Sequence, residues 1–110
     1  MNNKEIATAF FNGQKTDDKK SFFVEVINGV SIVFSYGYHF PIAIKFNDGY
    51  LANSDGYSNT TARHKSLILN EIKNELSDND FKTTNELKVI VDKVRYSDIR
   101  TKNEIIEAKI

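Results

Sequence analysis

The sequence predicts an α+β fold, in which an antiparallel sheet of about four strands packs against two longer helices and a short N-terminal helix. Two pairs of β-rich runs, each joined by a short turn that ends in glycine, predict two consecutive hairpins and hence the antiparallel sheet. Apolar residues at helical spacing in the second half of the chain predict the longer helices. Because the chain has 110 residues, we expect residues 1–110 to form a single domain.

The first residues predict the short helix, over residues 3–11. Asn2 or Asn3 can serve as its N-cap, because a side-chain oxygen at that position accepts a hydrogen bond from the first turn of the helix. Gly13 can end the helix, since glycine adopts the left-handed backbone conformation that commonly follows a last turn. Residues 14–20 are polar and predict a loop.

Two hairpins are predicted after this loop. Asn28-Gly29 separates two runs that are rich in β-branched and aromatic residues, and Asn-Gly between such runs is a strong local signal for a hairpin. Asn47-Asp48-Gly49 joins a second pair of runs in the same way. The four expected strands comprise residues 22–27, 30–36, 42–46 and 50–53.

The first longer helix is expected over residues 60–76, with Ser58 or Asn59 as its cap. On a helical projection His64 falls on the flank of the apolar arc, and Arg63 points away from it. We expect that arc to pack on the sheet; it comprises Thr61, Ala62, Ile68, Leu69, Ile72 and Leu76, with Lys65 among them.

A capping box, Thr83-x-x-Glu86, predicts the start of the second longer helix. Apolar residues then recur at i, i+3, i+4 and i+7, although the β-branched run of residues 89–91 leaves a strand open. We expect both longer helices on the same face of the sheet, and residues 97–110 allow a short terminal helix. The recurring apolar residues are Leu87, Ile90, Val91 and Val94.

The charge balance argues against a protein that binds its partner mainly by nonspecific electrostatic attraction to phosphates. Fifteen Lys and Arg residues are matched by fifteen Asp and Glu residues, so the formal net charge is zero. Near the C-terminus a group of cations is interrupted by Asp92 and Asp98, which favours a solvated surface over a basic patch. The cations of that group are Lys93, Arg95, Arg100 and Lys102.

The chain contains no cysteine, which excludes disulfides, thiolate catalysis and cysteine-bound zinc. Its N-terminus lacks the apolar stretch of a signal peptide, and no apolar run approaches the length needed to span a membrane. We therefore expect a cytoplasmic protein that does not contact membranes.

A candidate ligand site is the run of residues 55–64, which leads into the first longer helix. A helix N-terminus carries free N–H groups and a partial positive charge, so Ser58 and Thr60 could bind an anion there, with Arg63 or His64 adding charge. In the alternative interpretation, which the frequency of such caps favours, Ser58 only caps the helix, and His64 packs at the edge of the helix–sheet interface with one nitrogen satisfied. The run is not a Walker loop, because it lacks the glycine-rich cradle and its lysine.

A second candidate site is the aromatic connection between the two hairpins. Tyr36, Tyr38, His39 and Phe40 lie there in close succession, followed by Pro41, the single proline of the chain. Exposed aromatic side chains on a loop can stack on bases or anchor a protein interface. In the alternative interpretation Tyr36 and Phe40 cover the core, and Pro41 sets the entry to the next strand.

The two histidines, His39 and His64, could serve acid–base chemistry or hold a metal together with Asp48 or Asp55. A triad of Ser58, His64 and Asp55 is also conceivable. However, the sequence contains no metal-binding histidine motif, and Ser58 does not lie in a G-x-S-x-G turn. We therefore expect no catalytic residues, no metal and no cofactor.

The order of several short motifs resembles a group of short proteins encoded by phages and other mobile elements. The motifs are Phe11-x-Gly13, Ser35-Tyr36, Ile42-Ala43-Ile44, Asn53 and Tyr57-Ser58-x-Thr60-Thr61-x-x-His64. The resemblance spans residues 7–68 and leaves the C-terminal third unmatched. It implies a viral or mobile-element origin and no particular reaction. The stretch of residues 37–41 is longer and more aromatic here than in the pattern of that group.

Taken together, these observations predict a non-enzymatic accessory protein of a phage or mobile element that binds a host macromolecule. The expected partner is a host protein or ribonucleoprotein, and inhibition of a host defence system is one expected role. The alternative is a nucleotide- or nucleic-acid-binding domain that uses Ser58–Thr61 and Arg63, with stacking by Tyr36 or Tyr38. A second alternative is a histidine-based acid–base enzyme.

Overall fold

A computed structural model describes residues 2–35, 37–54, 59–75, 81–84, 86–96 and 101–102, and at positions 39, 59–61, 71–75 and 81–83 it describes the backbone alone. Its centre is a five-stranded sheet in the order β1-β2-β3-β4-β5. The first four strands pair antiparallel, as the sequence predicts. They are β1 (Phe22–Ile27), β2 (Val30–Ser35), β3 (Phe40–Phe46) and β4 (Gly49–Asn53).

The first hairpin turns at the expected dipeptide. Asn28 and Gly29 both adopt positive φ angles, 52° and 84°, and Ile27 pairs with Val30 across them. Two positive φ angles are what a two-residue hairpin turn needs to match the twist of its strands, and Asn followed by Gly adopts them at low cost. The local sequence therefore determines this hairpin and its register.

The fifth strand, β5 (Phe81–Thr84), is an addition to the predicted sheet. It pairs parallel with β4, with Tyr50 opposite Phe81. The predicted capping box at Thr83 and Glu86 is therefore wrong, because Thr83 lies in β5. Instead, the Thr84 hydroxyl accepts a hydrogen bond from the backbone N–H of Glu86 at 3.1 Å, and the next helix begins at Leu87.

Three α-helices and one short 3-10 turn complete the described chain: α1 (Asn3–Phe11), η1 (Gly37–His39), α2 (Asn59–Glu75) and α3 (Leu87–Tyr96). The predicted N-cap of α1 is confirmed. The Asn2 side chain accepts from the backbone N–H of Glu5, and the Glu5 carboxylate accepts from that of Asn2. None of these helices, within the part of the chain that is described, has the length and apolar character required to cross a bilayer.

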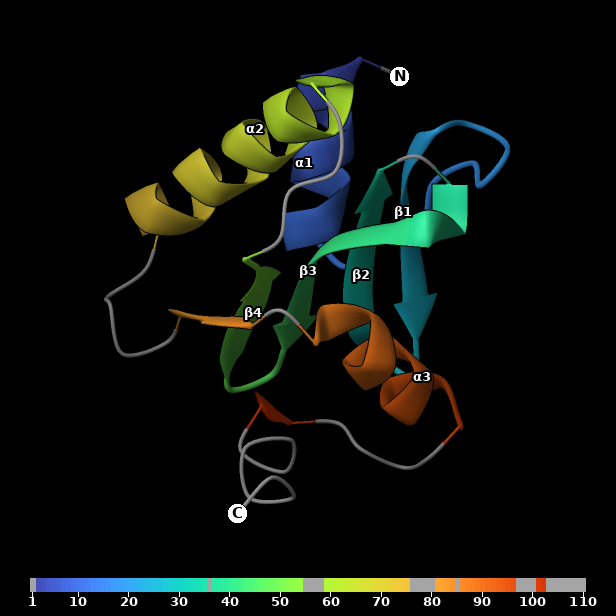
Figure 1. Cartoon of the computed structure of the whole chain (residues 1–110), viewed down its shortest axis with the longest axis vertical. Coiled ribbons are helices and arrows are strands. Elements are labelled where there is room, and N and C mark those ends of the chain that lie inside the picture. Colours follow the sequence, from blue (N-terminus) through green and yellow to red (C-terminus); the bar gives the residue numbers. More distant parts are fainter. Residues whose placement is uncertain are drawn as a thin grey trace.

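The helices cover both faces of the sheet, and the expectation that the two longer helices share one face is wrong (Figure 1). Alternate residues of β1 point to opposite faces: Phe22 and Val24 join a core under α1 and α2, whereas Phe23 joins a second core under α3. A sheet that is buried on both faces has continuous apolar strands, and every residue of β2 is indeed buried.

Residues outside the sheet make hydrogen bonds to its edge strand β1 and to the β3–β4 turn. The backbone N–H of Thr16 donates to the carbonyl of Val24 at 2.9 Å, and the Thr16 hydroxyl accepts from the N–H of Val24 at 2.7 Å. Both outward backbone groups of this residue on the edge strand are thereby paired. At the β3–β4 turn, the Asp48 carboxylate accepts a hydrogen bond from the backbone N–H of Lys102 at 2.6 Å.

Candidate functional site

The structure separates the residues of the aromatic connection. Phe40 begins β3 and is only 5% exposed, in the core under α1 and α2. Tyr38 lies in η1 on the opposite side of the sheet and is 46% exposed. Tyr36 lies outside the described residues, as does the side chain of His39. Of the four predicted partner-binding residues, Tyr38 alone is therefore described as exposed and able to contact a partner.

Tyr38 is fixed in position by rings and by carboxylates. Its ring packs edge-on against Phe23 and Phe34, with centroids 4.9 and 5.2 Å away. Its hydroxyl donates to Asp18 Oδ2 at 3.0 Å and lies 3.4 Å from Glu25 Oε2. Burial, the hydrogen bond to Asp18 and the Glu25 charge together raise the pKa of Tyr38 to about 12. The hydroxyl consequently stays protonated and acts as a hydrogen-bond donor.

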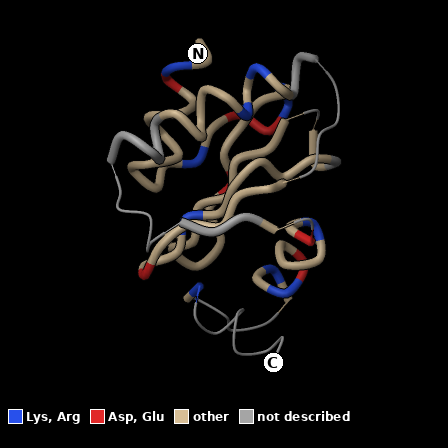
Figure 2. The backbone as a smooth tube through the Cα atoms, turned by 60° about the vertical axis from the view of Figure 1, so that its left-hand side comes forward, with Lys and Arg blue, Asp and Glu red and all other residues tan. Residues whose placement is uncertain are grey.

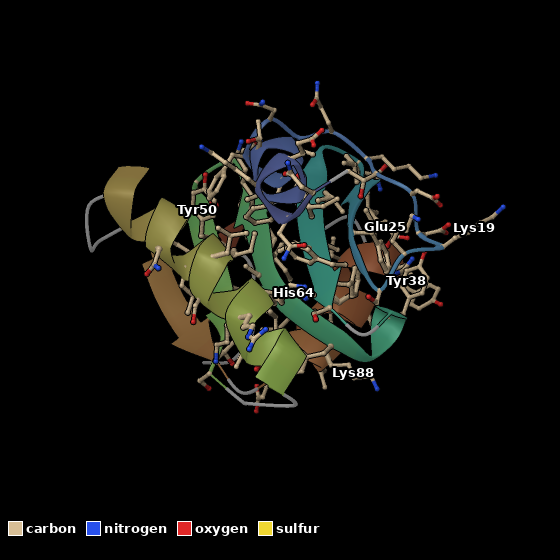
Figure 3. All side chains as sticks on the ribbon, turned by 90° about the horizontal axis from the view of Figure 1, so that it is seen from above. Lys19, Glu25, Tyr38, Tyr50, His64 and Lys88 are labelled. Atoms are coloured by element: carbon tan, nitrogen blue, oxygen red, sulfur yellow. The ribbon has the colours of Figure 1, made fainter. Side chains whose placement is uncertain are left out.

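Arg95 connects α3 to this group. Its Nη2 lies 2.6 Å from Glu25 Oε1, and its Cζ lies 5.8 Å from the centroid of the Tyr38 ring. The hydrogen bond to Glu25 raises the pKa of the guanidinium above its ordinary value. Figure 3 shows Tyr38 beside Glu25 at one end of the molecule. These contacts join β1, η1 and α3 at one corner of the molecule, where Glu25 compensates the Arg95 charge.

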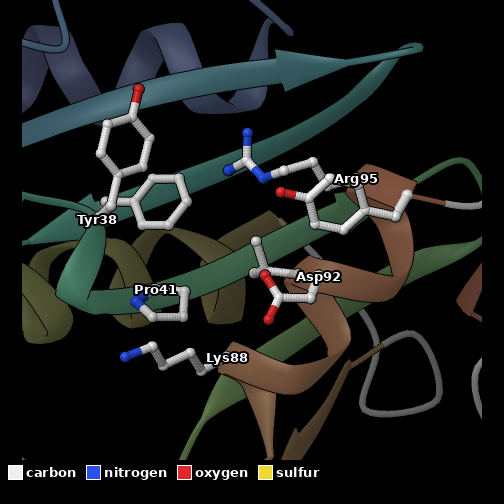
Figure 4. A pocket seen from close by; sticks show the side chains of 8 residues that line it. Tyr38, Pro41, Lys88, Asp92 and Arg95 are labelled. Carbon is white, nitrogen blue, oxygen red and sulfur yellow. The ribbon is translucent and has the colours of Figure 1, made fainter.

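A groove of about 340 Å³ lies between η1, the start of β3 and α3 (Figure 4). Rings and a branched side chain provide its apolar part, and charged groups of both signs stand around it. Asp92 is among these charged groups, and no hydrogen bond or ion pair of its carboxylate is found in the described part of the chain. The lining residues are Phe34, Tyr38, Pro41, Lys88, Val91, Asp92, Arg95 and Tyr96.

Exposed apolar side chains gather beside the same groove. Among the described side chains three large hydrophobic residues are exposed: Tyr38 at 46%, Val89 at 56% and Tyr96 at 81%. Val89 and Tyr96 are seven residues apart on α3 and so lie on one face of that helix. We call the combined area the η1–α3 surface, which comprises Tyr38, Lys88, Val89, Asp92, Arg95 and Tyr96.

The charges of α3 do not form a basic patch. The helix carries Lys88, Lys93 and Arg95 and one acidic residue, Asp92, which lies between Lys88 and Lys93 in the sequence (Figure 2). Arg95 is paired with Glu25, Lys102 is buried at the β3–β4 turn, and Arg100 lies outside the described residues. Of the four cations near the C-terminus that the sequence grouped, Arg95 and Lys102 are therefore not free to bind phosphates on a common surface.

The structure also separates the candidate ligand residues of the run 55–64, which leads into α2. Ser58 lies outside the described residues, and for Thr60 the structure describes the backbone alone, in the first turn of α2. Arg63 is exposed, as the helical projection predicts, and His64 is buried, packed between helix and sheet as the alternative interpretation of this run expects. Ala62, expected in the apolar arc, is exposed. The apolar arc of α2 is thus rotated toward His64 and Ile68.

His64 is held by β1 and β2. Its Nδ1 lies 2.8 Å from the Ser35 hydroxyl, and its ring stacks on Phe22 with centroids 4.0 Å apart. Burial lowers the pKa of His64 below the ordinary value, so the ring is neutral near pH 7. Ser35 is only 1% exposed, which leaves its hydroxyl unavailable as a nucleophile toward a substrate. The sequence did not indicate this pair, because Ser35 precedes His64 by 29 residues.

A second cavity, of about 350 Å³, reaches His64 from the side of α1. We call it the His64 cavity; its lining residues are Asn3, Ile6, Asp17, Lys20, Ser21, Phe22 and His64. None of the described residues form a cluster of three or more metal-ligating side chains, so neither cavity has the ligand set of a metal site in the part of the chain that is described.

Comparison with protein families matches residues 8–87 to a family of unknown function, DUF8033. The chain belongs to this family. No curated protein and no solved structure matches it. The DUF8033 match contains the sheet, α2, Tyr38, Ser35 and His64, and it ends where α3 begins. The α3 side of the groove therefore lies beyond the part of the chain that defines the family.

Proposed function

We propose that this protein is a small non-enzymatic binding protein that contacts a host protein through the η1–α3 surface. In keeping with the resemblance to phage and mobile-element proteins, the partner is a host macromolecule, and inhibition of a host defence system is one role of the complex. The supporting observation is that all three large hydrophobic residues exposed among the described side chains lie on this one surface.

The chemistry of the surface favours a protein partner over a nucleic acid. Tyrosines are enriched at the centres of protein interfaces, because the ring supplies apolar area and the hydroxyl a hydrogen bond at little entropic cost. A phosphate backbone would meet the Asp92 carboxylate in the groove and an Arg95 that Glu25 already compensates. The expected occupant is a protein segment that places an apolar side chain in the groove and charged groups at Lys88 and Asp92.

The test is affinity capture of partners from host-cell lysate, with and without nuclease treatment. The Val89→Ala/Tyr96→Ala double variant removes two exposed side chains, so the fold should persist, and loss of two interface anchors should weaken capture by more than about 2 kcal/mol. Arg63→Ala on α2 is the matched control, because Arg63 is exposed and lies outside the η1–α3 surface.

The proposal requires that one protein be retained by the wild type and by Arg63→Ala, resist nuclease, and be lost with the double variant. Binding that survives the double variant, or that disappears with nuclease, would overturn it. Steep weakening of binding as salt rises would instead favour the nucleic-acid alternative.

A further inference from the structure

The His64 cavity is lined by a buried side chain that has one ring nitrogen without a protein partner in the described part of the chain. His64 is only 7% exposed and lines the cavity. Its Nδ1 is engaged by Ser35, and within the described part of the chain its Nε2 has no hydrogen-bond partner. Phe22 covers one face of the ring at 4.0 Å, so the ring cannot turn away from this position. Nε2 is therefore the ring nitrogen that a ligand in the cavity could contact.

The other polar groups around the cavity are mainly donors. Asn3 is the first residue of α1 and lines the cavity, and its backbone N–H has no acceptor among the described residues, because the capping box serves the N–H groups of Asn2 and Glu5. This N–H group and the helix dipole favour an anion. Lys20 adds an ammonium group that has no ion-pair partner in the same set of residues.

One carboxylate also lines the cavity. Asp17 Oδ1 accepts the backbone N–H of Lys19 at 3.0 Å, and the Asp17 carbonyl accepts that of Lys20 at 3.3 Å. The carboxylate is thus engaged in its own turn and offsets part of the Lys20 charge. The imidazole, the α1 N-terminus and the Lys20 ammonium line one cavity from three parts of the chain. Three donors suit an anion with three terminal oxygens better than a carboxylate with two.

We propose that the His64 cavity binds a small molecule bearing a phosphate monoester, with His64 Nε2–H, the Asn3 N–H at the start of α1 and the Lys20 ammonium as donors to the phosphate oxygens. The proposal takes the tautomer in which His64 Nδ1 accepts from the Ser35 hydroxyl and the ring proton lies on Nε2, an arrangement that the 2.8 Å contact between Nδ1 and the hydroxyl fits. The volume of about 350 Å³ exceeds that of a bare ion and falls in the range of small-ligand sites. The site lies under α1 and α2, on the face opposite the η1–α3 surface.

Titration with inorganic phosphate at constant ionic strength and pH, followed by NMR of the histidine ring, tests the proposal directly. The His64 ring resonances should shift and saturate, while those of His39 serve as an internal reference for nonspecific association. Acetate is the comparison anion and should bind more weakly. Absence of a saturable shift, an equal response of both histidines, or acetate binding as tight as phosphate binding would each overturn the assignment.

Two neighbouring lysines provide matched variants. Lys20→Gln should weaken phosphate binding about two- to fivefold, because it removes one partly solvated charge from the cavity. Lys19→Gln removes an equal charge from the same loop, at a residue that does not line the cavity, and should leave the affinity unchanged. Equal weakening by both variants would indicate general surface charge and contradict the site. The Val89→Ala/Tyr96→Ala variant should bind phosphate normally, so this test is independent of the proposed function.

Discussion

The imidazole of His64 stacks face to face on the ring of Phe22, with centroids 4.0 Å apart and planes 5° from parallel. The two residues come from α2 and β1, so the stack joins the helix to the edge strand of the sheet. Protonation of the imidazole would place a charge between the helix and the sheet. Burial therefore lowers the pKa of His64, and the folded protein resists that proton while the unfolded chain accepts it near pH 6.5.

This relationship predicts a pH-dependent stability. The free energy of unfolding should fall as the pH drops below 6.5, because the unfolded state then binds a proton that the native state does not, and the loss should end below the lowered native pKa. Urea denaturation at pH 7.5 and at pH 5.5 measures the change. The same comparison on His64→Gln removes the contribution of this group. If the variant loses as much stability over this interval as the wild type, His64 is not the residue responsible.

Tyr38 predicts a loss of stability at the opposite end of the pH scale. Because the pKa of Tyr38 is raised to about 12 in the fold, the native state holds a proton that the unfolded chain releases near pH 10. Stability should therefore decrease as the pH rises from 10 toward 12. Spectrophotometric titration of the tyrosines near 295 nm should show one phenol that ionises last. That component should be missing in Tyr38→Phe, which keeps the ring contacts and should cost about 1 kcal/mol of stability.

Local sequence predicted the parts of the fold that are determined locally. Asn28-Gly29 sets its hairpin through two positive φ angles, and the Asn2–Glu5 capping box sets the start of α1. Leu87, Ile90, Val91 and Val94 are all buried beneath α3, as their helical spacing predicts. In each case the residues that determine the structure lie within a few positions of one another.

The features that sequence reasoning missed depend on partners far apart in the chain. The four residues of β5 form a strand only because β4, some thirty residues earlier, offers an open parallel edge at Tyr50 to Asn53. The signal that could have placed α3 on the second face is Ile32-Val33-Phe34 in β2, where three consecutive apolar residues are buried, and two covered faces explain this better than one. His64 became a buried residue through Ser35 and Phe22, and no local pattern marks either contact.

The pair of Glu25 and Arg95 should contribute measurably to stability. Its atoms lie 2.6 Å apart, and the side chains are only 17% and 30% exposed, so solvent screens the pair less than it screens an ordinary surface pair. A double-mutant cycle with Glu25→Gln and Arg95→Met should give a coupling of about 1 kcal/mol. Arg95→Lys should recover part of it, since lysine cannot reproduce the planar contact with Glu25 and the Tyr38 ring. Additive single effects would contradict this interpretation of the corner.

Thr16 should protect the edge of the sheet. Its hydroxyl accepts the hydrogen bond of the buried Val24 N–H at 2.7 Å, so Thr16→Val keeps the shape of the side chain but leaves that N–H without its partner. We expect a loss of about 1–2 kcal/mol in unfolding free energy, together with faster aggregation because β1 then presents an open backbone edge. Thr8→Val in α1 is the matched control, since its hydroxyl bonds the Lys4 carbonyl on an exposed face and the change should stay within about 0.5 kcal/mol. Light scattering during refolding measures the aggregation of both variants. Equal losses of stability and equal scattering for the two variants would mean that the Thr16 hydroxyl does not protect this edge.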